Sequence, residues 1–222
     1  MYQAVVFDLF GTLAREYQGT VYTRMAERLG IPQTLFWEHW SKSSPERSRG
    51  GQSYRDSLTE MCQKLGLPLS AETIEEVAAI RLEETKNALA STRPGAREVL
   101  STFSRAAIPL GLLSNATPEV AQLWPSCGLG SHFKATVFSC EVGMGKPEPE
   151  IYRLVCGRLG VKPEYCLYVG DGADKELEGA AAAGMTSVQI RTTRQRIPEA
   201  RYFIESLQGL LPILGITSYS PD

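Results

Sequence analysis

Several side chains that can do chemistry stand at or shortly after the ends of short apolar runs in the chain. They are Asp8, Ser114, Asn115, Lys146, Asp171 and Glu176. A carboxylate can act as a nucleophile, hydroxyl, amide and ammonium groups can bind phosphoryl oxygens, and paired carboxylates can hold Mg²⁺. If these side chains meet, the set predicts phosphoryl transfer through a covalent aspartyl intermediate.

The apolar runs predict strands of a parallel sheet. They cover residues 4–7, 110–113, 135–138, 166–169 and 187–190. Continuous apolar runs without alternation suit strands that are buried on both faces. Because helical stretches at 147–159 and 174–183 alternate with the later runs, we expect an α/β fold. Ligands bind outside the carboxyl ends of such strands, so the reactive side chains would meet at one edge of the sheet.

A long stretch without strands interrupts this alternation between Thr12 and Arg93. It predicts helices at 20–29, 33–42, 52–65 and 71–89. We expect residues 16–90 to form a small all-helical second domain, and residues 1–15 and 91–222 to form the α/β core. A last strand at 200–204 and a last helix at 206–214 would complete that core.

The composition excludes several classes of protein. The 222 residues carry 23 Lys and Arg against 25 Asp and Glu, a net charge of −2, which lacks the basic excess of a nucleic-acid binder. No apolar run approaches the roughly 20 residues that span a bilayer. Five cysteines without a CxxC pair favour reduced thiols over a zinc site or disulfides. Since the first residues are unlike a signal peptide, we expect a cytoplasmic monomer or homodimer with a small-molecule substrate.

The motifs taken together resemble those of the haloacid dehalogenase superfamily of hydrolases. Four segments carry the resemblance, in the family's order: FDLFGTL at 7–13, LLSN at 112–115, GKPEPEIY at 145–152 and YVGDGADKELEGA at 168–180. Each alone is a weak signal, but all four after the expected elements form a specific one. The resemblance implies a Rossmann-like core with helices on both faces, and a helical cap domain inserted after the first motif.

The resemblance also implies an activity, that of a Mg²⁺-dependent phosphatase for small phosphorylated metabolites. Asp8 would be the nucleophile. Asp8, Asp171 and the backbone carbonyl of Phe10 would bind Mg²⁺. Ser114 and Lys146 would hold the phosphate, and Lys146 would also offset the charge on Asp8.

Supporting roles follow by the same resemblance. Gly11, Thr12 and Asn115 would line the substrate site. Glu176 stands five residues after Asp171, where many members of the family carry an acidic residue. It would orient metal-bound water without ligating the metal itself.

The helical insertion offers fewer signals. Arg47, Arg49 and Tyr54, with an intervening pair of glycines, stand where capped relatives often place a specificity loop. We expect Arg49 and Tyr54 to bind substrate, because an arginine can meet a carboxylate or second phosphate. Phe36, Trp37 and Trp40 stand at helical spacing, which predicts core positions.

One residue departs from the phosphatase pattern. Phosphatases of this family carry a second aspartate two residues after the nucleophile, as general acid and base, and this chain has Phe10 there. Losing such a group typically costs roughly 10²–10⁴ in rate. Poor leaving groups would suffer most, and acyl or aryl phosphates least.

Two alternatives to the phosphatase therefore stay open. Dehalogenases of this superfamily usually have an aromatic residue at this position and use no metal, so a 2-haloacid dehalogenase-like hydrolase is one alternative. Their fourth motif lacks the Gly-Asp pair, however, and this chain keeps Gly170, Asp171 and Glu176. The other alternative is a degenerate member that binds a ligand without turnover.

Overall fold

The computed structural model describes residues 2–67 and 70–216, so residues 1 and 217–222 of the predicted core lie outside it. A six-stranded sheet forms its centre, with the strand order β3-β2-β1-β4-β5-β6 and every neighbouring pair parallel. The strands are β1 (Ala4–Phe7), β2 (Leu110–Ser114), β3 (Ala135–Phe138), β4 (Cys166–Gly170), β5 (Thr186–Ile190) and β6 (Tyr202–Ile204). This is the doubly wound order of a Rossmann-like fold, which confirms the predicted α/β class.

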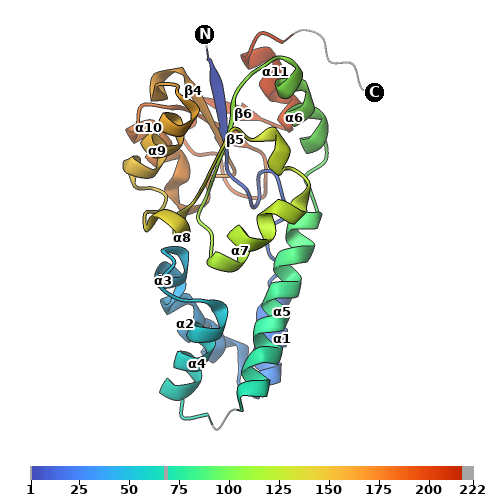
Figure 1. Ribbon diagram of the computed structural model, residues 1–222, viewed down its shortest axis with the longest axis vertical. Helices are drawn as coiled ribbons and strands as arrows, with labels where there is room; N and C mark the ends of the chain where they lie inside the picture. Colours follow the sequence, from blue (N-terminus) through green and yellow to red (C-terminus); the bar gives the residue numbers. More distant parts are fainter. Residues whose placement is uncertain (1, 68–69, 217–222) are drawn as a thin grey trace.

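Helices connect the strands and fill the long insertion after β1 (Figure 1). They are α1 (Thr20–Leu29), α2 (Gln33–Lys42), α3 (Ser44–Ser48), α4 (Tyr54–Lys64), α5 (Ala71–Ala90), α6 (Ala96–Arg105), α7 (Pro118–Leu123), α8 (Ser139–Val142), α9 (Pro149–Leu159), α10 (Glu176–Ala182) and α11 (Leu210–Ile213). In the described part of the chain, no helix combines the length and hydropathy needed to cross a membrane.

The core is packed on both faces of the sheet. Val6 and Tyr168 belong to one cluster with residues of α9 and α10, and Phe7 and Leu112 belong to another with residues of α6 and α11. Figure 1 shows these two pairs of helices on opposite sides of the strands. The apolar runs do not alternate because both of their faces are covered.

The helical insertion has an apolar cluster of its own. Met25 of α1, Phe36 of α2, Leu58 of α4 and Val77 of α5 meet in it. Figure 1 shows α1 beside the long α5, below the carboxyl ends of the strands. The helices predicted at 20–29 and 33–42 are present with those bounds, and the other two shift by one or two residues at their ends.

Some predicted core helices differ from the structure. The helix predicted at 174–183 begins only at Glu176, because Asp174 and Lys175 both have a left-handed φ of 54°. The segment predicted as one helix at 206–214 is a 3₁₀ turn, Leu207–Gly209, followed by the short α11. The predictions also omitted α3, α6 and the short α8.

Candidate active site

The predicted reactive residues converge at the carboxyl ends of the central strands. The strand order reverses between β1 and β4, where a doubly wound sheet opens a crevice. Asp8 follows β1 there, and its backbone N–H donates to the carbonyl of Val169 in β4 at 2.9 Å. Asp8, Ser114 and Lys146 line a cavity of about 370 Å³ at this edge.

Lys146 is the centre of a buried polar network. Its Nζ lies 2.5 Å from Oδ1 of Asp8, 2.6 Å from Oε2 of Glu176 and 3.2 Å from the Tyr168 hydroxyl. Burial alone would lower the pKa of Lys146, but the carboxylates of Asp8 and Glu176 outweigh it and raise that pKa. Lys146 is therefore held as an ammonium group beside the predicted nucleophile.

For the carboxyl groups of Asp8 and Glu176, burial outweighs the effect of Lys146 on the pKa. Burial raises the pKa of Asp8, and Lys146 opposes that rise. Burial also raises the pKa of Glu176 to about 7, again against Lys146. Glu176 accepts further hydrogen bonds from the Tyr168 hydroxyl at 2.7 Å and from the backbone N–H of Gly172 at 3.0 Å. The charged partner of Glu176 is thus Lys146, a contact that the sequence analysis did not predict.

Asp171 is fully buried directly after β4, and it is not among the residues that line the cavity of about 370 Å³. Its Oδ1 accepts from the N–H of Ala173 and its Oδ2 from Nε of Arg194, both at 2.9 Å. Gly11 has a φ of 83°, and a Cβ there would collide with Oδ2 of Asp171. Glycine is therefore required at this turn for conformation and for space.

Arg194 is a site residue that sequence reasoning missed. It lies in the loop between β5 and β6, and Nη2 also pairs with Glu16 at 2.6 Å. Several arginines follow β5, and no motif distinguishes Arg194 from the others. Only the loop conformation brings this one to Asp171.

Asn115 is hydrogen-bonded within the site, whereas, in the described part of the chain, the side chain of Thr12 is not. Asn115 accepts from the backbone N–H of Lys146 at 2.8 Å and donates to the carbonyl of the same residue at 3.1 Å. It also donates to Asp174 at 3.1 Å. Thr12 is fully buried, and its Oγ1 has no hydrogen-bond partner among the described residues. Asn115 thus fixes the loop that carries the lysine.

The acidic residues have the donor chemistry of a Mg²⁺ site. Oxygens of Asp8, Asp171 and Glu176 lie within 4.8 Å of one another, and all three residues are buried. Mg²⁺ prefers such hard oxygen ligands and keeps waters in its remaining positions. The residues present therefore fit the metal that the sequence analysis predicts.

Phe10 lies at the junction of two cavities. Its ring centroid is 4.6 Å from that of Tyr17. Both rings line the small cavity and a larger one of about 680 Å³ between the sheet edge and the helical insertion. The position that is acidic in typical relatives is thus part of an aromatic wall.

The larger cavity contains the predicted residues of the insertion. Arg49 and Tyr54 both line it. Arg49 also donates to the carbonyl of Gly143 at 2.8 Å and pairs with Glu148, while the Tyr54 hydroxyl accepts from Thr117 at 3.0 Å. Their predicted role in substrate binding stays a prediction.

Trp37 and Arg81 line the larger cavity, although the sequence analysis did not place either of them there. The core position predicted for Trp37 is wrong, because Trp37 is 49% exposed and lines the larger cavity. Arg81 of α5 also lines this cavity and was missed. Its position in a long helix with charges all along it gives no sequence signal.

Comparison with known proteins gives consistent matches. Residues 2–184 match the model of the haloacid dehalogenase-like hydrolases. A glyceraldehyde 3-phosphate phosphatase of Methanopyrus kandleri is 30% identical over 90% of this chain and 89% of its own. A phosphoserine phosphatase of Thermus thermophilus is 37% identical over 48% of this chain, which spans only 44% of that relative.

Solved structures of this superfamily share the fold of the chain. A HAD phosphatase from Thermococcus onnurineus superposes with a TM-score of 0.67 at 26% identity, covering 96% of this chain and 98% of its own. The L-2-haloacid dehalogenase of Xanthobacter autotrophicus gives the same TM-score at 20% identity, covering 98% and 100%. That second likeness concerns the fold alone.

Proposed function

The chain belongs to the haloacid dehalogenase-like hydrolases, and from that premise we propose that it is a Mg²⁺-dependent phosphatase. Its substrate would be a small phosphorylated metabolite, and the phosphoryl group would pass through Asp8. The observation that carries the proposal is the contact of Lys146 with Asp8 and Glu176 beside Asp171. The phosphatases among its relatives support the same reaction class.

In the proposed reaction the Asp8 carboxylate attacks phosphorus, and the bond from phosphorus to the leaving oxygen breaks. Lys146 favours the anionic form of Asp8, which burial alone would disfavour. Ser114 and Lys146 bind phosphoryl oxygens, and Glu176 holds the lysine in position. Water then attacks the phosphorus of phospho-Asp8, which releases phosphate and restores the carboxylate.

The metal would be held by Asp8, Asp171 and the carbonyl of Phe10. When bound, Mg²⁺ supplies neutralisation of the charge on the transferred phosphoryl group. Arg194 pairs with the same Oδ2 of Asp171, so this arginine would share or release that oxygen. We also infer that residues 16–90 form a separate domain that covers the substrate and excludes water.

The alternatives fit these residues less well. A metal-free dehalogenase gives the buried Asp171 beside Asp8 no role, since a halide leaves without metal assistance. A binding protein without turnover does not need Lys146 directly on Asp8. Phe10 restricts the phosphatase to leaving groups that need little protonation.

Trapping the intermediate tests this proposal. The protein is mixed with excess aryl phosphate and Mg²⁺ and quenched in acid, and its peptides are analysed by mass spectrometry. We expect a phosphoryl group on the peptide that contains Asp8, and none in Asp8→Asn. Turnover that persists in Asp8→Asn without such an adduct would overturn the proposal.

A further inference from the structure

Arg81 of α5 is a buried cation, and two of its nitrogen atoms lack hydrogen-bond partners in the part of the chain that the structure describes. The residue is only 6% exposed. Among the described residues, neither its Nε nor its Nη1 has a hydrogen-bond partner. A buried charge without a partner is costly, and removing water from donors without replacing their bonds adds to that cost. The expected partner of such a group is a ligand.

Aromatic rings stabilise the face of the Arg81 guanidinium, while Nε and Nη1 keep no hydrogen-bond partner among the described residues. The guanidinium carbon lies 3.5 Å from the ring centroid of Tyr17, and 5.4 and 5.6 Å from those of Tyr54 and Tyr22. Rings attract a cation over their faces, yet they accept few of its N–H bonds. The carboxylate three residues along α5, Glu84, already accepts from Arg15 at 2.9 Å and from the N–H of Gln18 at 3.0 Å.

A second buried arginine strengthens the positive charge of this region. Arg47 is 4% exposed, and its guanidinium lies 3.8 Å from the Trp40 ring. It donates to the Trp40 carbonyl at 3.0 Å and to the Ser43 hydroxyl, both uncharged partners. Burial lowers the pKa of Arg47 to about 10, which still leaves it charged near neutral pH. Among the described residues, no carboxylate pairs with Arg47 or Arg81.

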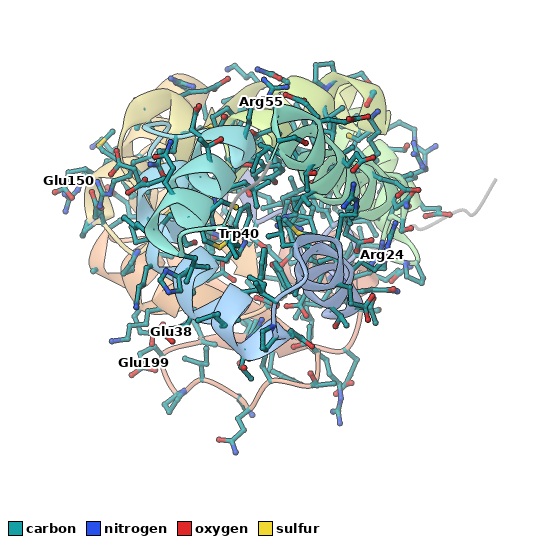
Figure 2. All side chains as sticks on the ribbon, turned by 90° about the horizontal axis from the view of Figure 1, so that it is seen from below. Arg24, Glu38, Trp40, Arg55, Glu150 and Glu199 are labelled. Carbon is teal, nitrogen blue, oxygen red and sulfur yellow. The ribbon has the colours of Figure 1, made fainter. Side chains whose placement is uncertain are left out.

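One cavity connects these arginines to the reaction site. Arg81 and Arg47 line the insertion end of the 680 Å³ cavity, and Asn115 and Lys146 line its other end. Aromatic rings also line this cavity, and Figure 2 labels one of them, Trp40, near the centre of the view from the insertion side. A ligand that spans the cavity would have an anion at each end and an apolar middle.

We propose that Arg81, with Arg47 beside it, binds a second anionic group of the substrate at the insertion end of this cavity. That group is a carboxylate or a second phosphate, which a planar guanidinium binds through two parallel hydrogen bonds. The inference rests on the proposed function, which places the reacting phosphate at Lys146. The substrates are then phosphate esters with a distal anion and an apolar portion between.

The test uses three aryl phosphates that differ only at the position opposite the phosphate. One carries a carboxylate, one the neutral carboxamide of the same shape, and one a second phosphate. Phosphate release gives kcat and KM for the natural sequence, for Arg81→Gln and for Arg24→Gln. Arg24 is the matched control, because it lies on α1 of the same insertion, outside the cavity lining, in an exposed pair with Glu83.

We expect kcat/KM to favour the anionic compounds over the carboxamide by about tenfold or more, the effect of one hydrogen bond to a charged group. Arg81→Gln should lose this preference, because its kcat/KM should fall more for the two anionic compounds than for the carboxamide, and Arg24→Gln should keep it. The more favoured anionic compound identifies the distal group. Equal rates for charged and neutral compounds in the natural sequence would overturn the inference, as would an equal loss for all three in Arg81→Gln.

Failure of the proposed function gives a different result, with no phosphate release from any compound. In that case calorimetry with the same compounds measures binding, and the preference for the distal anion and its loss in Arg81→Gln decide the inference alone. If Arg81→Gln does not fold, equal rates for the three compounds on the natural sequence would still overturn the inference.

Discussion

Phe10 is the residue that separates this chain from typical phosphatases of its family. Its ring packs on Tyr17 at the point where the two cavities meet. A phenyl group neither donates a proton to a leaving oxygen nor accepts one from water. In the proposed reaction the leaving group must therefore depart with little protonation, and the aromatic wall favours an apolar substrate next to the phosphate.

Restoring the acid tests the role of this position. We expect Phe10→Asp to raise kcat on alkyl phosphates by about tenfold or more, since general acid catalysis contributes roughly 10²–10⁴ when well placed. The effect on aryl phosphates should be much smaller. Steady-state phosphate release measures both. Phe10→Asn is the matched control, with similar shape and no proton to give, and an equal gain in that variant would contradict the argument.

The residues at the strand ends and Arg81 of the insertion differ in how well the sequence predicts their place in the site. Asp8, Ser114, Lys146 and Asp171 lie at the ends of parallel strands or in the segments that follow them. The carboxyl ends of parallel strands share one edge of the sheet. Arg81 is different, because nothing in the sequence gives the distance from α5 to that edge. It depends on how the insertion packs over the sheet.

Residues next to α3 and at the start of α4 make polar contacts between the insertion and the core. Arg49 follows α3 and reaches the loop that carries Lys146, where it bonds the Gly143 carbonyl and pairs with Glu148. Tyr54 starts α4, and its N–H donates to Glu119 of α7 at 2.6 Å. The sequence predicted the helices well because caps and apolar spacing are local. It could not predict α3 or these contacts, which depend on three-dimensional approach.

Breaking one of these contacts should affect catalysis more than stability. Arg49 and Glu148 are 50% and 38% exposed, and such pairs contribute about 1 kcal/mol or less. We expect Arg49→Ala to raise KM a few-fold with little change in Tm, because the insertion would cover the site less often. Arg55→Ala is the control, since it breaks an exposed pair with Glu75 inside the insertion. Equal KM values in the two variants would contradict this role.

At the scale of the whole molecule, the carboxyl edge of the sheet holds a cluster of buried charges. Asp8, Lys146, Asp171 and Glu176 are all buried at the carboxyl edge of the sheet, and three of these four are acidic. A bound divalent cation would offset that excess of negative charge. Because a ligand that binds only the folded state stabilises it, metal binding should be visible in the unfolding temperature of the entire chain.

Metal addition and removal test this expectation. At a hundredfold excess over Kd, Mg²⁺ would stabilise the fold by about 2.7 kcal/mol. For a chain of this size that is a rise in Tm of roughly 5–10 °C, which EDTA should reverse. Asp171→Asn should abolish the rise, and Arg194→Gln should reach it at lower Mg²⁺, because Arg194 no longer competes for Asp171. The same rise in Asp171→Asn would contradict a metal site there.

The central claim is phosphate release that depends on Mg²⁺ and on Asp8. The most direct measurement is release of phosphate from acyl, aryl and alkyl phosphates, and of halide from 2-haloacids, with Mg²⁺ or with EDTA. Asp8→Asn is measured in parallel with Glu205→Gln, a control at an exposed carboxylate that pairs with Arg191. We predict Mg²⁺-dependent phosphate release, fastest from acyl and aryl phosphates, unchanged in Glu205→Gln and lost in Asp8→Asn. Halide release in EDTA, or phosphate release that survives in Asp8→Asn, would contradict the account.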